Sequence, residues 1–429
     1  MSGPQTIQLP QHRDLYYGGQ WHVPKGGYVD TWNPATGECL GPCAEANAAD
    51  VDDAVKAAQA AFVEWSRTKP SERAALMRKV ATVLREHASE LALLDAANCG
   101  NPVAEMTRDV QAAAAQFDFF AGLVTEIKGD TIPMGEGVVN MSVREPYGVV
   151  GRIVAYNHPL MFTAAKSAAP LAAGNTVVMK PPVQAPLSAY RWMELIDGIL
   201  PPGVLNIVSG GTECGSALSA HPDVPFVSLI GSVPTGRAVA RAGAERLKRI
   251  TLELGGKNAC IVYPDADLDR AAAGAVQGMN FTWCGQSCGS TSRLFVHESI
   301  HDEVVARMLE KIRHYRPGLP TDPATTMGAI ISQSQLDKIM KYIELGKEEG
   351  ATLVYGGKRP DDPALSKGFF IEPTVFTNVT ADMRIANEEI FGPVLSVIKW
   401  NDEETMLAQV NAVEYGLTGA VFTRDLANA

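Results

Sequence analysis

The sequence predicts an α/β fold built from two successive parallel sheets. From Gly148 onward, short apolar runs of strand length alternate with segments of helical periodicity. This alternation is typical of parallel sheets that carry helices on their faces. A second series of the same kind begins after the Gly255-Gly256 turn. The chain of 429 residues is long enough for about two to three domains, so we expect a domain boundary at this turn.

The part of the chain before Gly148 is expected to be mainly helical. Apolar residues recur there at three- and four-residue spacing, which indicates amphipathic helices. Ser71 is an expected N-cap, and Asn98-Cys99-Gly100 is an expected helix end. The expected helical stretches cover residues 50–65, 71–97 and 109–126, and the alternating pattern of residues 138–145 predicts a β-strand.

The two alternating series give a regular succession of strands and helices. In the first series, strands are expected over residues 149–155, 176–179, 204–208 and 225–230, and helices over 163–173, 188–200 and from 236 onward. In the second series, strands are expected over residues 258–263 and 293–297, and helices over 268–279 and 300–313. Except for the strand at 204–208, each expected strand is followed by a helix, as in a parallel sheet.

Composition and charge argue against several classes of function. The chain is 46% hydrophobic and 20% charged, which is ordinary for a soluble globular protein. Its formal net charge of -11 argues against a nucleic-acid-binding protein, because such proteins carry a basic surface. No apolar run reaches the roughly 18 residues of a membrane helix, and the N-terminus lacks the order of a signal peptide. We therefore expect a cytoplasmic protein with no membrane partner.

The seven cysteines are scattered along the chain, and their number is odd. This arrangement does not predict a disulfide framework, and reduced thiols fit a cytoplasmic compartment. Cys39 and Cys43 are four residues apart, as are Cys284 and Cys288, but no histidines stand at the spacing of a zinc site. We expect no metal centre.

Two short segments suggest a thiol nucleophile and its base. Cys288 follows small residues in Gly285-Gln286-Ser287, and a thiol that attacks a carbonyl carbon needs such an open approach and a nearby proton acceptor. Glu253 ends an apolar run directly before a Gly-Gly turn and can supply the acceptor. Each segment alone has a simpler interpretation. A cysteine in such a setting is more often a small buried hydrophobic residue, and a glutamate before a turn is usually solvated.

Six segments spread over most of the chain form a more specific set. They are Tyr156-Asn157-His158-Pro159-Leu160, Lys180-Pro181-Pro182, Gly231-Ser232-Val233-Pro234-Thr235-Gly236, Glu253-Leu254-Gly255-Gly256-Lys257, Gly285-Gln286-Ser287-Cys288 and Glu389-Ile390-Phe391-Gly392-Pro393-Val394. In this order they resemble the motifs of the aldehyde dehydrogenase superfamily, and the resemblance covers roughly residues 13 to 429. No single one of these motifs would be as specific.

The resemblance implies a particular division of the chain. Residues 1–123 and 147–254 would form a Rossmann-like NAD(P)-binding domain, and residues 255–429 an α/β catalytic domain. Residues 124–146 would form a small β arm for oligomerisation, in a homodimer or homotetramer. Members of the family continue beyond the point that matches Ala429, so we expect the catalytic domain of this sequence to be incomplete at its C-terminus.

The resemblance also implies a mechanism. The thiolate of Cys288 would attack the aldehyde carbon to give a hemithioacetal, hydride would pass to the nicotinamide, and water would hydrolyse the resulting thioester. Glu253 would be the general base. Asn157, together with the backbone N–H of Cys288, would stabilise the oxyanion. Lys166 matches a lysine that the family uses in proton relay or in tuning the catalytic dyad. For Asn157 and Lys166, a turn asparagine and a solvated helix lysine remain alternatives.

The cofactor residues follow from the same resemblance. Gly231, Ser232 and Gly236 would place the start of a helix against a phosphate, because helix N-termini present free N–H groups and positive charge. The remaining cofactor residues would be Tyr156, Lys180 for the adenosine ribose, Glu389 for the nicotinamide ribose and Phe391 beside the nicotinamide. NAD-selective relatives often carry a glutamate three residues after the lysine, where this sequence has Val183. Because no carboxylate would repel a 2′-phosphate, we expect NAD or NADP as cofactor.

The substrate is specified only as an aldehyde. His158, Phe162, Trp283 and Gly289 lie next to the matched motifs and could line an apolar or aromatic acyl tunnel, although such aromatics are often core residues. Two other functions stay open. The first is a CoA-acylating relative, which Glu253 argues against because a base suited to water favours hydrolysis. The second is a catalytically inactive, truncated binding or structural protein.

Overall fold

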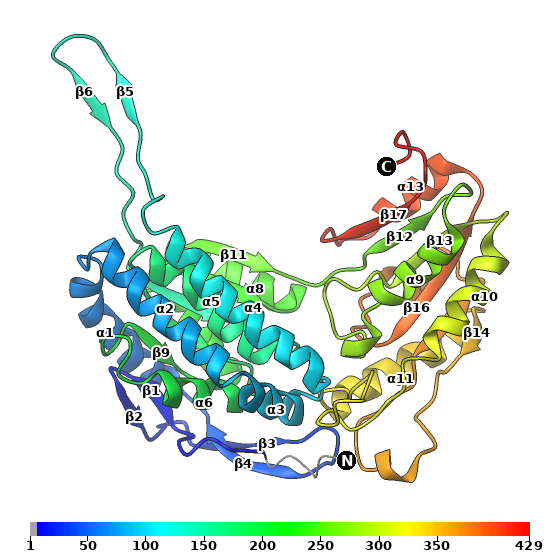
Figure 1. The fold of residues 1–429 in the computed structure, drawn as a ribbon, viewed down its shortest axis with the longest axis horizontal. Coiled ribbons are helices and arrows are strands. Elements are labelled where there is room, and N and C mark those ends of the chain that lie inside the picture. The colour runs from blue at the N-terminus through cyan, green and yellow to red at the C-terminus, as the bar shows by residue number, and fades with distance from the viewer. Residues whose placement is uncertain (1–6) are drawn as a thin grey trace. The chain divides into compact units, whose positions relative to one another are not determined.

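The computed structural model describes residues 7–429, which fold as two compact units (Figure 1). The first unit comprises the described residues up to Trp32, Cys39–Asn98 and Met106–Glu253. The second comprises Asn33–Glu38, Cys99–Glu105 and Leu254–Ala429. The two short early segments of the second unit were not indicated by the sequence.

The first unit is built on a seven-stranded sheet with the strand order β11-β10-β7-β8-β9-β1-β2. Its strands are β1 (Leu15–Tyr17), β2 (Gln20–His22), β7 (Val149–Ile153), β8 (Thr176–Lys180), β9 (Leu205–Ile207), β10 (Phe226–Ile230) and β11 (Arg249–Glu253). The strands from β11 to β9 are parallel, and β1 runs antiparallel to β9 and β2. The central strand β8 is buried along its whole length, as expected for a parallel sheet covered on both faces. The four predicted strands of this unit are confirmed to within two residues; β8 is one residue longer than predicted and the other three are shorter.

Helices cover this sheet in two layers. The layer of α1 (Ala48–Trp65), α7 (Thr212–Ala220) and α8 (Val233–Ala244) packs together, as does the layer of α2 (Pro70–Glu86), α5 (Pro159–Ala172) and α6 (Leu187–Ile196). The unit also contains α3 (Ala88–Cys99), most of α4 (Val103–Gly122) and a two-stranded ribbon of β3 (Tyr28–Trp32) and β4 (Cys39–Ala44). Helix α7 was not predicted from the sequence.

Several predicted helix boundaries are wrong, and proline explains three of them. Ser71 is not an N-cap, because α2 already begins at Pro70. Helix α5 begins at Pro159, four residues earlier than predicted, and Pro234 lies in the first turn of α8. Proline fits the first helical turn because its fixed φ is already helical and no N–H is lost there. The stretch 71–97 is divided at His87 into α2 and α3, whereas the predicted end at Gly100 is confirmed by its φ of +87°.

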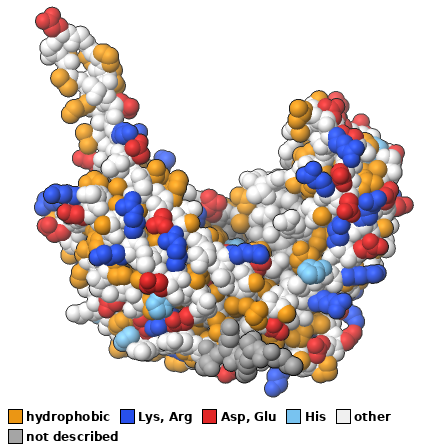
Figure 2. Space-filling model, in the orientation of Figure 1, with side chains coloured by type: hydrophobic (Ala, Val, Ile, Leu, Met, Phe, Trp, Pro, Cys, Tyr) orange, Lys and Arg blue, Asp and Glu red, His pale blue; other side chains and the backbone are white. Residues whose placement is uncertain are grey.

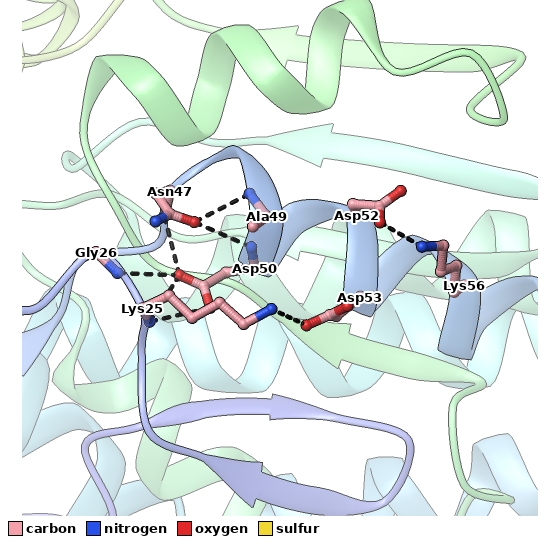
Figure 3. Close-up of polar contacts among 8 residues, drawn as sticks. All are labelled: Lys25, Gly26, Asn47, Ala49, Asp50, Asp52, Asp53 and Lys56. Carbon is pink, nitrogen blue, oxygen red and sulfur yellow. Dashed lines mark hydrogen bonds and ion pairs between the residues drawn. The ribbon is translucent and has the colours of Figure 1, made fainter.

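The start of α1 is fixed by a buried carboxylate (Figure 3). The side chain of Asn47 accepts hydrogen bonds from the backbone N–H groups of Ala49 and Asp50, and Asp50 accepts from the N–H of Asn47. This capping box satisfies N–H groups that a helix end leaves open. Asp50 is 1% exposed and also accepts from the N–H groups of Lys25 and Gly26, so it joins α1 to the N-terminal segment.

A long hairpin extends from the first unit after α4 (Figure 1). Its ladder is short and antiparallel, formed by β5 (Thr131–Pro133) and β6 (Val139–Met141). The strand predicted over 138–145 is therefore confirmed only in its first part. Ile132, Val139 and Met141 are exposed, and hydrophobic side chains mark the hairpin in Figure 2. These residues form an apolar surface without a core of their own.

The second unit is built on a six-stranded sheet with the order β14-β15-β16-β13-β12-β17. The strands are β12 (Ala259–Val262), β13 (Arg293–His297), β14 (Thr352–Tyr355), β15 (Thr374–Thr377), β16 (Val394–Trp400) and β17 (Gly419–Phe422). All pairs are parallel except β14 with β15. The helices are α9 (Leu268–Gly278), α10 (His301–Ile312), α11 (Gln333–Glu348), α12 (Arg384–Asn387) and α13 (Glu403–Asn411). The two strands and two helices predicted here are confirmed to within about two residues. Among the described helices, none combines the length and apolarity needed to cross a bilayer.

Candidate active site

Cys288 lies on a tightly folded loop of the second unit, between a 3₁₀ turn (Phe281–Trp283) and β13. Cys284 and Gly285 in this loop have φ values of 54° and 65°, and Asn280, directly before the 3₁₀ turn, has a φ of 55°. Gln286 is buried, and it accepts from the N–H of Ile331 at 3.1 Å. The buried side-chain amide of Gln286 therefore fixes the loop to the backbone at Ile331.

The cysteines differ sharply in exposure. Cys288 is half-buried and Cys39 is exposed, whereas the other five are buried. Burial raises the pKa of Cys43, Cys214 and Cys260 to about 12, and it also raises the pKa of Cys284. Those thiols stay protonated at neutral pH and are poor nucleophiles. Cys284, four residues before Cys288, is therefore a core residue.

Three of the sequence motifs meet around Cys288 within the second unit. Asn258 donates its side-chain amide to the carbonyl of Cys288 at 2.7 Å and to that of Ser290 at 3.0 Å. A Cβ at Gly256 would lie 2.7 Å from the Cys288 carbonyl, and one at Gly285 would lie 2.2 Å from the carbonyl of Gly392. The glycines permit an approach that any side chain would block. The motifs around Gly256, Cys288 and Gly392 are therefore packed backbone to backbone.

Glu389 is fixed against the same glycine turn. The backbone N–H of Gly256 donates to Glu389 Oε1 at 3.0 Å, and a Cβ at Gly255 would lie 2.2 Å from Oε2. Burial raises the pKa of Glu389, and the charges of Lys338 and Lys257 partly offset this effect. Phe391, two residues on, has a φ of 56°. A bulky residue in this region is unusual and marks a strained loop.

Sequence reasoning missed several residues of this region. Gln335 on α11 donates to the carbonyls of Ile390 and Phe391 and so holds the strained loop. The side chain of Lys257 is 2% exposed, and among the described residues its Nζ has no hydrogen-bond partner. Burial lowers the pKa of Lys257 to about 7. Only the position of Lys257 directly after the Gly-Gly turn could have drawn attention to it.

The remaining predicted catalytic residues belong to the first unit. Glu253 is exposed at the C-terminal end of β11. Asn157 is 4% exposed and directly precedes the N-cap of α5, and Lys166 is half-buried on that helix. The carbonyl of Glu253 accepts from the N–H of Gly231, so the predicted base borders the predicted phosphate turn.

A cavity of about 740 Å³ lies at the carboxyl ends of β7, β8 and β10 in the first unit. Tyr156, Lys180, Val183, Gly231 and Ser232 line it. Such a position and size are typical of nucleotide sites in parallel sheets. Ser232 caps α8 and accepts from the N–H of Thr235.

The donor chemistry of this cavity fits a dinucleotide. Lys180 is 7% exposed, and burial lowers its pKa, while the charges of Cys214 and Glu45 act in the opposite direction. A helix N-terminus faces the same cavity, and both features favour an anion or a sugar hydroxyl. Gly236 does not line the cavity. It lies buried in the first turn of α8, where its N–H bonds to the carbonyl of Ser232.

Sequence reasoning missed the part of the cavity lining that α7 and the residues directly before it supply. Gly211, Thr212, Gly215, Ser216 and Ser219 belong to α7 or directly precede it, and all line the cavity. A Gly-Gly-Thr sequence after a strand is a helix-start signal that could have revealed this part of the lining. Within residues 7–429, no group of three or more His, Cys, Asp or Glu side chains could hold a metal ion.

The first unit is a parallel-sheet unit with a nucleotide-sized cavity. The second unit holds a half-buried cysteine among glycine turns. Together these features fit a dinucleotide-dependent enzyme. The family comparison agrees with this class. The chain belongs to the aldehyde dehydrogenase family, whose model matches residues 21–429.

Individual relatives support this assignment over nearly the whole chain. Aldehyde dehydrogenase tropH from Talaromyces stipitatus is 52% identical over 434 residues, which cover 99% of this chain and 84% of that protein. The NAD+ complex of an aldehyde dehydrogenase from Bacillus cereus has a TM-score of 0.93 and 39% identity, with 97% and 85% of the two chains covered. A 3,6-anhydro-L-galactose dehydrogenase, solved with NADP, has a TM-score of 0.94 and 34% identity, with 97% and 88% covered.

Proposed function

We propose that this protein oxidises an aldehyde to a carboxylic acid with NAD+ or NADP+, and that Cys288 is its nucleophile. The observation that carries the proposal is the setting of Cys288. It is a half-buried thiol on a loop that is packed against the Gly255-Gly256 turn and the Glu389 segment. The other thiol of the same loop, Cys284, is buried and kept protonated.

In the proposed reaction, the Cys288 thiolate adds to the aldehyde carbon and forms a tetrahedral adduct. The side-chain amide of Asn157 and the backbone N–H of Cys288 donate to the oxyanion, and one such donor typically contributes about 3 kcal/mol. A bound nicotinamide cofactor would supply the hydride acceptor, and loss of hydride from the adduct would leave a thioester on Cys288. Glu253 takes a proton from the water that hydrolyses this thioester. Lys166 assists proton transfer.

Each unit carries residues that are proposed to contact the cofactor. In the first unit, Lys180 would bind the adenosine ribose, and Ser232 at the start of α8 would bind the pyrophosphate, with Gly231 and Gly236 shaping that turn. In the second unit, Glu389 would bind the nicotinamide ribose, and Phe391 would pack near the nicotinamide. Relatives solved with NAD+ and with NADP support the use of either cofactor. Val183, which lines the cavity, offers no carboxylate against a 2′-phosphate.

Under this proposal, residues 1–123 and 147–254 mainly bind the cofactor, although they also hold Asn157, Lys166 and Glu253. Residues 255–429 form the catalytic domain with Cys288, and they also hold the cofactor residues Glu389 and Phe391. The thiol state of all seven cysteines supports a cytoplasmic location.

The hairpin of β5 and β6 is proposed to serve oligomerisation, in a homodimer or homotetramer, because its exposed apolar residues lack a partner surface in one chain. Ile132→Ser combined with Val139→Ser should therefore lower the mass that light scattering gives for the purified protein. An unchanged mass would contradict this role.

A screen of aliphatic and aromatic aldehydes with NAD+ and with NADP+ tests the function directly. The reduced cofactor is followed by its absorbance, and free CoA is added in a parallel series. We expect reduction without CoA and release of the free acid. Turnover that requires CoA would identify an acylating enzyme instead.

A further inference from the structure

A buried polar cluster of the first unit surrounds the chain segment that carries Asn157. Helix α5 begins at Pro159, and its N-cap residue His158 makes no side-chain capping bond. The first N–H groups of a helix need acceptors from outside the helix. Asp95 on α3 supplies one, because its Oδ2 accepts from the N–H of Leu160 at 3.1 Å. Asp95 is 1% exposed, so this bond is shielded from water.

A second carboxylate fixes the residue next to Asn157. Asp109 on α4 bonds through Oδ2 to Nδ1 of His158 at 2.7 Å. The side chains of Asp109 and His158 are 8% and 17% exposed. The imidazole ring also packs against Phe162, one turn into α5, at a ring distance of 5.1 Å. The ring of His158 is therefore held from two sides.

The supports themselves are firmly packed. Leu91 and Leu94 on α3, and Val110 and Phe117 on α4, have no exposed surface. Burial raises the pKa of Asp95 to about 7, and the hydroxyl of Ser188 on α6 and the Leu160 N–H partly offset this rise. Burying a carboxylate costs free energy unless hydrogen bonds compensate for the lost water. The buried position of Asp95 therefore indicates that its bond to the Leu160 N–H serves a purpose beyond packing.

We infer that Asp95 and Asp109 are positioning residues that hold the amide of Asn157 in place by fixing the chain at Leu160 and His158. The inference rests on the proposed role of Asn157 as oxyanion donor. Two anchored points within three residues of Asn157 leave its backbone little freedom. A donor that is displaced by about 1 Å can lose about 10²-fold in rate, even when the mutation lies outside the reacting groups.

The test is a set of double-mutant cycles. The parent, Asn157→Ala, Asp95→Ala, Asp109→Ala and the two double variants with Asn157→Ala are compared for kcat, for KM of the aldehyde and for Kd of NAD+ by fluorescence. Asp95→Asn is included because its amide oxygen can still accept from Leu160. Asp50→Ala is the matched control, since Asp50 is an equally buried carboxylate at the start of α1 in the same unit.

Asp95→Ala and Asp109→Ala should each lower kcat by about 10- to 100-fold. The Kd of NAD+ should stay within about twofold, and Asp95→Asn should regain most of the activity. In the Asn157→Ala background, neither change should lower kcat further by more than about twofold, because the amide they position is already gone. Asp50→Ala should lower the melting temperature and leave kcat near that of the parent.

Other outcomes separate the two proposals. If Asn157→Ala lowers kcat but Asp95→Ala and Asp109→Ala do not, the positioning role is wrong while the oxyanion role stands. The positioning role is also wrong if the losses in kcat from Asp95→Ala or Asp109→Ala multiply with the loss from Asn157→Ala. It is equally wrong if those two variants change only the KM of the aldehyde. If Asn157→Ala itself keeps full kcat, both proposals fail. If Asp95→Ala does not fold, Asp109→Ala alone tests the positioning role, because that variant keeps the contact between Asp95 and the Leu160 N–H.

Discussion

At the scale of single residues, solvent exposure distinguishes Cys288 from Cys284, whereas their local sequence context did not. Cys284 and Cys288 stand four residues apart in similar small and polar surroundings, and only the family resemblance favoured Cys288. The fold places Cys284 in the core, with its pKa raised by burial, and leaves Cys288 half-buried. A nucleophile needs both access and ionisation. The core position of Cys284 follows from non-local packing, which no local pattern reveals.

Glu253 is the residue whose role kinetics can define best. Its exposed position at the end of β11 allows it to take a proton from solvent water. Glu253→Gln keeps the size of the side chain and removes the base, so steady-state turnover should fall by about 10² to 10⁴. If hydrolysis of the thioester is its task, rapid mixing should show a burst of about one reduced cofactor per active site. Unchanged turnover and an unchanged pH–rate profile would count against this role.

Val183 is the residue on which our prediction of the preference between NAD+ and NADP+ rests. It lines the cavity of the first unit together with the buried cation Lys180. The Kd of NADP+ should therefore lie within about tenfold of that of NAD+, which is about 1.4 kcal/mol. Val183→Glu should shift the preference towards NAD+, because it adds a ribose acceptor and repels a 2′-phosphate. Val183→Gln is the uncharged control. A parent protein that prefers NAD+ by more than about a hundredfold would contradict this account.

At the scale of elements, the loops carry more of the site than the helices and strands do. Gly285 has a φ of 65°, and a Cβ there would lie 2.2 Å from the carbonyl of Gly392. Gly285→Ala should therefore separate the Cys288 loop from the Glu389 segment, lower stability by about 1 to 3 kcal/mol and lower activity. At Gly289 a Cβ would meet only Ser287 Oγ at 3.7 Å, so Gly289→Ala should leave the melting temperature nearly unchanged. Equal melting temperatures for the two variants would contradict this packing.

The elements that sequence could predict are those with strong local patterns. The buried runs of β8, β10 and β13 stand out because strands covered on both faces are continuously apolar. Helix α7 and strands β1 and β2 were missed because they are short, and β1 also pairs with β9, which is far away in the chain. Among the site residues, the glycines that bring Cys288, Glu389 and Gly392 together are recognisable as turns. The contact of Gly256 with Glu389 joins residues 133 positions apart, and such non-local contacts were not predictable from the sequence.

At the scale of the whole molecule, each unit presents one part of the proposed chemistry. The first unit has the cavity with Lys180 and the start of α8, and the second has the glycine turns around Cys288. The family assignment rests on a match over residues 21–429 and on relatives that this chain covers to more than four fifths of their length.

Replacing Cys288 tests the central claim most directly. Parent protein, Cys288→Ala and Cys284→Ala are incubated with NAD+ and an aldehyde that the parent turns over, and reduced cofactor is followed by absorbance. Cys288→Ala should lose about 10³-fold or more in kcat and keep the Kd of NAD+, because only the nucleophile is removed. Cys284→Ala should retain activity if it folds. Activity that persists in Cys288→Ala would contradict the account.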